Sequence, residues 1–235
     1  MTSILALDTS TDACSAALQR GEQLESRYQL LPRKHNHLLF TMLGELLPDG
    51  AQAAGLDLLA YGQGPGSFTG LRIAASAVQG LAYTLELPVA GISTLACLAQ
   101  GAMRRGVVSA EDRVLVLIDA RINEVYWGYY GFDDGLATAL VPDQVSAPGD
   151  LPADLMEGNS LALGSGLAYF EALPSALQAA VASQVADQWP DSRDLIPLAM
   201  RAEAAGELVS AQQVQPVYLR NEIHWKKLSE QGPAA

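Results

Sequence analysis

Basic residues are scarce in this chain of 235 residues. Lysine and arginine together number 14 against 26 aspartates and glutamates, so the formal net charge is −12. The three lysines are Lys34, Lys226 and Lys227. Proteins that bind a nucleic-acid backbone unaided depend on clustered Lys and Arg side chains that displace its counterions. Apart from a short basic stretch between Arg220 and Lys227, the composition therefore excludes an independent nucleic-acid-binding surface.

Cysteine is almost as rare, and long apolar runs are missing. Cys14 and Cys97 lie in apolar surroundings without a nearby histidine or cysteine, so neither a metal knuckle nor a redox pair is indicated. No apolar run reaches the roughly 20 residues that span a bilayer, and the first residues lack a secretory pattern. We expect a soluble, cytoplasmic protein with reduced, buried thiols and no membrane contact.

Signatures of a self-sufficient catalytic site are also lacking. The only histidines are His35, His37 and His224, and neither G-x-S-x-G nor H-E-x-x-H occurs. No lysine follows a glycine, which excludes the nucleotide-binding pattern G-x-x-x-x-G-K-[ST]. The dinucleotide pattern G-x-G-x-x-G fails because its third glycine position falls on Ser67 or Thr69. The sequence therefore predicts no catalytic residue and no metal site.

What the chain does contain is a repeated pattern of strand, aspartate turn and strand. The apolar run Ile4 to Leu7 leads into Asp8-Thr9-Ser10, and a second strand follows from Cys14 to Leu18. The pattern returns with a strand over 114–118, the turn Asp119-Ala120-Arg121 and an aromatic strand over 124–132. Further strands are expected over 24–30, 56–61, 89–92 and 161–163. Helices are expected over 37–47, 71–85, 94–103 and 195–209. A connector is expected over 142–158 and a short last element over 217–220.

This layout predicts an α/β fold with two lobes. We place the first lobe at 1–104 and the second at 105–235, with the C-terminal helix as a candidate to pack back on the first lobe. Duplicated lobes that each contain a β-hairpin are typical of the fold shared by actin, hexokinase and the heat-shock chaperones (ASKHA). In that fold, paired hairpin turns grip nucleotide phosphates across a cleft, although fold alone does not give function.

Two segments admit more than one interpretation. Asp8, Thr9 and Ser10 form either a phosphate loop, since amides and hydroxyls bind anions, or a hairpin turn satisfied by its own side chains. The glycine-rich segment 63–70 is either a phosphate cradle before a helix or a strand-to-helix turn that needs positive φ. Because Asp119 is followed by alanine where a phosphate loop would have glycine, a retained fold with a weakened nucleotide grip is the better interpretation.

Several segments together resemble the TsaB family, also called YeaZ. They are ILALDTSTDACSAAL (4–18), HNHLLFTMLGELL (35–47), YGQGPGSFTGLRIAASAVQGLAY (61–83), LIDARINEVYWGYY (117–130) and PVYLR (216–220). The resemblance implies a role in forming N6-threonylcarbamoyladenosine at position 37 of tRNAs that decode ANN codons. It also implies a paralogous relation to the catalytic subunit TsaD, which holds a metal on H-x-x-x-H. That motif falls on Thr94 and Leu98 here, and leucine cannot ligate a metal.

The resemblance further implies a partner surface on the first two helices. It implies that this surface binds TsaD, and that the same surface can form a homodimer in the isolated protein. The ATPase TsaE would then dock on the TsaB–TsaD pair, and tRNA would be contacted only through the complex. Helix 37–47 has a wide apolar face and helix 71–85 is rich in small residues, as an interface would require, although both helices could also be plain core. The expected contact residues are Leu38, Leu39, Met42, Leu43, Leu46, Phe68, Ile73 and Ala77.

The sequence thus favours a non-catalytic scaffold that activates TsaD. Asp8, Thr9 and Ser10 are then remnants of a phosphate loop, no cofactor is required, and only weak ATP or ADP binding is expected. The alternative is an independent nucleotide-dependent enzyme of the same fold, an ATPase or small-molecule kinase. The intact Asp8 favours that alternative, whereas the missing glycine after Asp119 and the missing general base speak against it.

Overall fold

The computed structural model describes residues 2–31, 35–156 and 160–220, which form two five-stranded sheets. The first sheet has the strand order β3-β2-β1-β4-β5. Its strands are β1 (Ile4–Asp8), β2 (Ala13–Arg20), β3 (Gln23–Leu30), β4 (Leu58–Gly64) and β5 (Val89–Ser93). The first three strands are antiparallel, and β1, β4 and β5 are parallel. This arrangement brings the ends of β1 and β4 to one edge of the sheet.

The second sheet repeats this arrangement with the order β8-β7-β6-β9-β10. Its strands are β6 (Val114–Arg121), β7 (Glu124–Asp133), β8 (Leu136–Ser146), β9 (Ser160–Leu163) and β10 (Val181–Val185). The pairs β6–β7 and β7–β8 are antiparallel, and β6–β9 and β9–β10 are parallel. The duplication confirms the predicted α/β fold with two hairpin-containing lobes of the actin, hexokinase and heat-shock chaperone type. The division of the chain at residue 104 stays a prediction.

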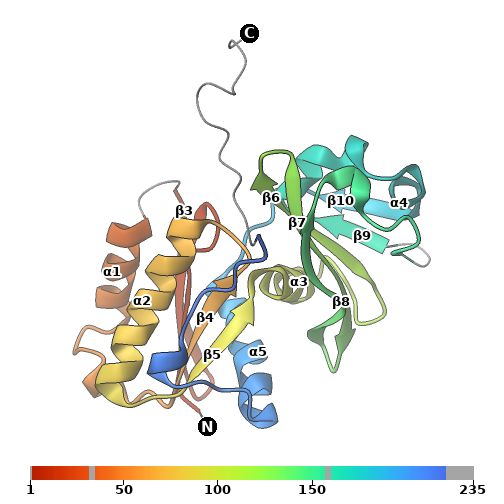
Figure 1. The fold of residues 1–235 in the computed structure, drawn as a ribbon. Coiled ribbons are helices and arrows are strands. Elements are labelled where there is room, and N and C mark those ends of the chain that lie inside the picture. The colour runs from red at the N-terminus through yellow and green to blue at the C-terminus, as the bar shows by residue number, and fades with distance from the viewer. Residues whose placement is uncertain (1, 32–34, 157–159, 221–235) are drawn as a thin grey trace, which may run out of the picture.

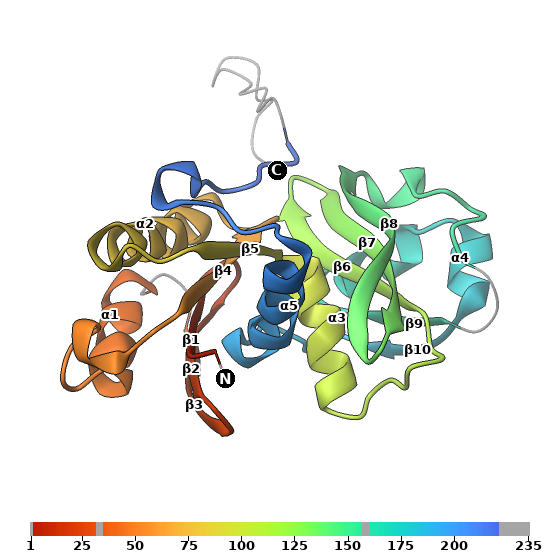
Figure 2. The same ribbon diagram turned by 90° about the horizontal axis from the view of Figure 1, so that it is seen from below.

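Helices cover the sheets in layers. Helices α1 (His35–Leu46) and α2 (Phe68–Leu85) cover one face of the first sheet, where they share a core with β1, β2 and β4 (Figure 1). Helices α3 (Thr94–Arg104) and α5 (Ser192–Ala205) lie between the two sheets and form a second core (Figure 2). The short helix α4 (Ser175–Ala180) and a 3₁₀ segment (Ser165–Ala172) cover the outer side of the second sheet. In the described residues, no helix is long and apolar enough to cross a membrane.

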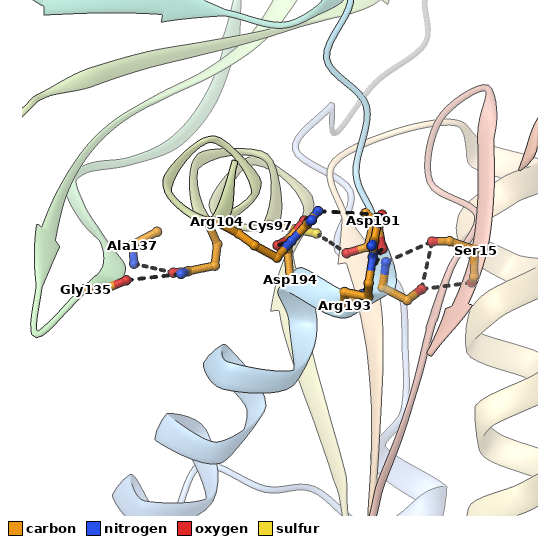
Figure 3. Close-up of polar contacts among 10 residues, drawn as sticks. Ser15, Cys97, Arg104, Gly135, Ala137, Asp191, Arg193 and Asp194 are labelled. Atoms are coloured by element: carbon orange, nitrogen blue, oxygen red, sulfur yellow. Dashed lines mark hydrogen bonds and ion pairs between the residues drawn. The ribbon is translucent and has the colours of Figure 1, made fainter. Parts of the chain in front are cut away.

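Polar contacts connect the helices between the sheets (Figure 3). Ser192 at the start of α5 donates its backbone N–H to Ser15 Oγ at 2.9 Å and its hydroxyl to Ser15 O at 2.8 Å. Arg104 at the end of α3 contacts Asp194 through two hydrogen bonds, Nε–Oδ1 at 2.6 Å and Nη2–Oδ2 at 3.0 Å. Because Asp194 is buried, this pair joins α3 to α5 inside the molecule. Asp191 caps α5 by accepting from Arg193 N.

Both cysteines are buried and free, as predicted. Cys97 lies in the core between the sheets and Cys14 in the core under α1 and α2. Burial raises the pKa of Cys14 to about 12 and the pKa of Cys97 well above its ordinary value. Both therefore stay neutral thiols and act as small apolar side chains.

Several predicted element boundaries are wrong. The connector expected over 142–158 begins inside β8, which runs to Ser146, and β10 and α4 were not predicted at all. The last helix ends at Ala205 instead of residue 209, because Gly206 adopts a left-handed C-cap. No helix or strand forms over 217–220. The turn of the second hairpin lies at Arg121, Ile122 and Asn123, all with positive φ, so Asp119 belongs to β6 instead.

Candidate functional site

The aspartate loop after β1 is closed to solvent. Asp8, Thr9 and Ser10 are all fully buried. Asp8 Oδ1 accepts hydrogen bonds from Ser10 N at 3.0 Å and from Ser10 Oγ at 2.8 Å, which is the hairpin-turn geometry. Within the described part of the chain, Asp8 Oδ2 has no hydrogen-bond partner. A phosphate could reach these groups only if the segment that covers them moved.

Burial also changes the acidity of Asp8. Desolvation raises its pKa from 3.8 to about 6, and the nearby charge of Asp191 acts in the same direction. The two hydrogen bonds from Ser10 favour the carboxylate and offset part of this rise. At neutral pH the group is therefore mostly ionised with one buried oxygen unpaired, which destabilises the fold.

The glycine-rich segment 63–70 packs directly on the aspartate loop. Ser67 N donates to Ser10 O at 2.7 Å, and Thr9 Oγ1 donates to Gly70 O at 2.7 Å. A Cβ on Gly66 would overlap Ser10 O, and a Cβ on Gly70 would overlap Thr9 O. These glycines are thus required for close approach to the aspartate loop and not for approach to a phosphate.

The segment is also the strand-to-helix turn that the sequence offered as one of two interpretations. Gly64 has a φ of +121°, and Ser67 caps α2 by accepting from Gly70 N. The first turn of α2 therefore packs on the loop after β1. The cradle that a phosphate would need is filled by the protein's own backbone.

A cleft of about 750 Å³ lies between the lobes, next to this closed loop. Side chains from both hairpins line it, with Thr11, Asp12 and Phe68 on one side and Asp119, Arg121 and Arg220 on the other. Arg121 is paired with Asp119 through its own backbone N–H at 2.8 Å and through Nη1 at 3.1 Å. Arg220 Nη2 donates to Ala120 O at 3.1 Å and to the Glu124 carboxylate. Both cations in the lining are therefore already neutralised by acidic partners.

The C-terminal segment passes from the first lobe to this cleft. Val217 N donates to Gln63 O at 2.7 Å, and Tyr218 OH accepts from Arg72 Nε at 3.0 Å. The Tyr218 ring packs against Phe68 with centroids 5.3 Å apart. Phe68 is therefore engaged by the protein itself, although its ring is about half exposed. Trp225, Lys226, Lys227 and His224 lie outside the described residues.

The positions where the resemblance would place a metal pair are buried. Thr94 is the first residue of α3 and is inaccessible to solvent, and Leu98 one turn later is 1% exposed. Among the described residues, no group of three or more His, Cys, Asp or Glu side chains could hold a metal ion.

The expected partner-binding residues on α1 and α2 divide into two sets. Leu39, Met42, Leu43 and Leu46 are buried against the first sheet, which corrects their placement on an exposed face. The wide apolar stripe of α1 is buried in the core, because the face of the sheet beneath it is also apolar. Leu38, Ile73 and Ala77 are half-buried and Phe68 is exposed, and their partner role stays a prediction.

The structure adds surface residues that the sequence did not single out. Phe40 on α1 is 60% exposed, although it lies within the same apolar run. Gly44 on α1 and Gly80 on α2 are exposed, and a Cβ at either would meet nothing within 4 Å. Helical phase could have separated Phe40 from its buried neighbours, since it falls outside the stripe of Leu39 and Leu43. The outer side of α1 and α2 therefore combines an exposed aromatic ring with two open glycines.

Comparisons with known proteins agree with one another. A family model described as "TsaD: tRNA N6-adenosine threonylcarbamoyltransferase" matches residues 29–224. The Escherichia coli "tRNA threonylcarbamoyladenosine biosynthesis protein TsaB" is 37% identical over 231 residues, which is 96% of this chain and 97% of that protein. The Haemophilus influenzae protein of the same name is 35% identical, with 96% of each chain covered.

A solved structure shows the same fold. YeaZ from Pseudomonas aeruginosa superposes with a TM-score of 0.85 at 40% identity, covering 93% of this chain and 100% of that one. Full-length matches at this identity, together with the duplicated hairpin lobes, leave one assignment. The chain belongs to the TsaB (YeaZ) family, a branch of the wider family that the TsaD model describes.

Proposed function

We propose that this protein is a non-catalytic scaffold subunit in the biosynthesis of threonylcarbamoyladenosine on tRNA. Its relatives carry the name of that pathway, and the family model that matches it describes the transferase. In this proposal the chain binds and activates TsaD, TsaE docks on the pair, and tRNA is contacted only through the complex. The net charge of −12 supports a division of labour in which a partner holds the tRNA.

The outer side of α1 and α2 is the observation that supports the proposal best. A helix from a partner can approach closely where side chains are small, and Gly44, Ala77 and Gly80 offer such positions. Phe40, exposed one turn before Gly44 on α1, is the kind of aromatic anchor that dominates interface energies. The same surface would hold two copies together in the isolated protein, since a homodimer would use the site that TsaD leaves empty.

Glycine at position 80 permits a sharp test. Because a side chain there meets open space, Gly80→Arg leaves the fold intact but blocks the approach of a partner helix. Phe40→Glu removes the anchor without opening the core. Leu140→Glu is the matched control, because Leu140 is 46% exposed but lies on β8 in the second lobe. Both test variants should lose binding to TsaD in size-exclusion chromatography, and the control should keep it.

Activity is measured in parallel as the threonylcarbamoyladenosine that purified TsaD and TsaE, together with TsaC, a further protein of the same pathway, form on tRNA with each form of this protein. The wild type and Leu140→Glu should support modification, whereas Gly80→Arg and Phe40→Glu should not. Equal modification with this protein omitted would contradict the scaffold role. Loss of TsaD binding in all three variants would show instead that the surface is wrongly located.

We propose that the cleft between the lobes binds ATP or ADP weakly at most, without turnover. The aspartate loop is closed by Gly66 to Gly70, and the arginines of the cleft are paired with Asp119 and Glu124. The rival function, an independent ATPase or kinase, requires Asp8 to act on a bound nucleotide. Hydrolysis of ATP by the purified protein that disappears in Asp8→Asn would favour the rival, and background hydrolysis in both forms would exclude it.

A further inference from the structure

After α5 the chain returns to the first sheet as a strap over residues 209–220. Val209 pairs with Val89 of β5 through two backbone hydrogen bonds of 2.9 Å, and Tyr61 OH of β4 donates to Gln215 O at 2.9 Å. Further along, the strap binds β4 again and packs on the start of α2. Figure 2 shows it leading from α2 toward the end of β6. The strap is therefore fixed to the first sheet and its helix along most of its length.

Arg220 is the residue of the strap that reaches the second sheet. Its Nη2 donates to Ala120 O at 3.1 Å and to the Glu124 carboxylate, so it holds both strands of the β6–β7 hairpin. In the described part of the chain, the other hydrogen bonds from the strap to the rest of the protein go to β4, β5 and α2. The Arg220 side chain is 19% exposed and lines the cleft. One guanidinium group therefore connects the strap with the hairpin across the mouth of the cleft.

The end of this hairpin has a backbone conformation that its own residues disfavour. Arg121, Ile122 and Asn123 have φ values of 63°, 56° and 57°. A left-handed backbone is unfavourable for a β-branched residue such as isoleucine, and hairpin turns of this kind normally contain glycine or asparagine. Ile122 is 74% exposed, so its side chain gains little from packing. A contact from outside the turn, such as that of Arg220, is therefore needed to hold this end in one position.

We propose that Arg220 is a clasp that sets how far the cleft between the lobes is open. While Arg220 binds Ala120 O and Glu124, the end of the hairpin lies against the strap and the cleft is narrow. When this contact breaks, the end of the hairpin moves away from the strap and the cleft widens, whereas the core between the sheets keeps the rest of β6 in place. The contact is suited to reversible release, because the Glu124 side chain is 36% exposed and ion pairs open to solvent are weak.

Tryptophan quenching by acrylamide measures the opening of the cleft. Trp189 lines the cleft and Trp127 is 1% exposed, so with Trp225→Phe in every form the quenching reports on Trp189. Arg220→Ala should raise the quenching constant at least about twofold, because a freed hairpin end exposes more of the cleft to solvent. In the same variant, the backbone amides of 119–124 should exchange faster with deuterium. Thermal unfolding should be unchanged, since Arg220 belongs to none of the three apolar cores.

Arg121→Ala is the matched control for the loss of a positive charge. Arg121 lines the same cleft but pairs with Asp119 of its own strand, so this variant should leave the quenching unchanged. Glu124→Arg alone should raise the quenching, and its combination with Arg220→Glu should lower it again, because the ion pair is restored with exchanged signs. Unchanged quenching and exchange in Arg220→Ala would overturn the proposal. So would an equal increase in Arg121→Ala, since the loss of charge, and not of the contact, would then open the cleft.

Discussion

The buried carboxyl of Asp8 makes a residue-scale prediction about pH. An aspartate whose pKa is higher in the folded state than 3.8 binds protons more readily when folded, so its contribution to stability falls as pH rises from 3.8 to about 6. Asp8→Asn should abolish this fall, which amounts to about 2–3 kcal/mol of unfolding free energy. Urea denaturation at pH 4.5 and at pH 7.5 measures the free energy of unfolding of both forms. The variant should be more stable than the wild type only at the higher pH.

Ser10→Ala is the control, because it should change the pH dependence of stability in the opposite direction. It keeps the backbone hydrogen bond to Asp8 Oδ1 but loses the hydroxyl donor, so the pKa of Asp8 should rise further and the pH dependence should steepen. A pH dependence that is unchanged in both variants would mean that Asp8 does not titrate in this window.

At this scale the sequence singled out three residues but did not decide their conformation. Asp8, Thr9 and Ser10 were predicted to form either a phosphate loop or a satisfied hairpin turn, and the local pattern could not decide. The deciding contact comes from Gly70, which lies 61 positions from Thr9 in the sequence. Long-range packing of this kind leaves no mark on the local sequence.

The glycines of α2 make an element-scale prediction. Gly70→Ala places a Cβ onto Thr9 O, and the backbone there cannot yield easily because Ser67 and Thr9 hold both sides. We expect a loss of about 1–3 kcal/mol in unfolding free energy. Gly80→Ala, in the same helix but facing open space, should gain about 0.5–1 kcal/mol from helix propensity. Chemical denaturation of both variants measures the contrast, and equal effects would contradict the packing of α2 on the loop.

Elements with strong periodicity were predicted well, whereas the two edge strands of the second sheet, β8 and β10, were missed in part or altogether. The helical spacing in 37–47 located α1, but spacing does not say which apolar residues remain for a partner, and Leu39 and Leu43 proved to be core. The end of β8, from residue 142 to Ser146, was assigned to a connector because Pro142 and Asp143 are typical of loops. Proline is tolerated at edge strands and at bulges, and Pro142 lies at both: β8 is an edge strand, and its register with β7 shifts between Val141 and Gln144.

At the scale of the whole molecule, the duplicated hairpins were visible in the sequence but the contacts that join the lobes were not. Arg104 and Asp194 lie 90 positions apart, and neither belongs to a motif. Their pair lies between the sheets because α5 returns from the second lobe to pack on the first (Figure 3). Burial raises the pKa of Asp194 and the nearby charge of Asp191 adds to the rise, while the guanidinium of Arg104 offsets part of it.

Removing Arg104 should therefore destabilise the whole fold. Arg104→Ala leaves the Asp194 carboxylate, whose side chain is 1% exposed, without its partner, and the expected loss is about 3–5 kcal/mol of unfolding free energy. Adding Asp194→Asn should recover part of this loss, because no charge then stays buried.

Arg27→Ala is the matched control: its ion pair with Glu45 has the same 2.6 Å separation but is half-exposed, so we expect a loss of about 1 kcal/mol or less. Similar losses in Arg104→Ala and Arg27→Ala would show that burial does not decide the strength of the interlobe pair. A large loss confined to Arg104→Ala, with a single cooperative transition, would mean that the two lobes unfold as one unit because α3 and α5 are held together between them.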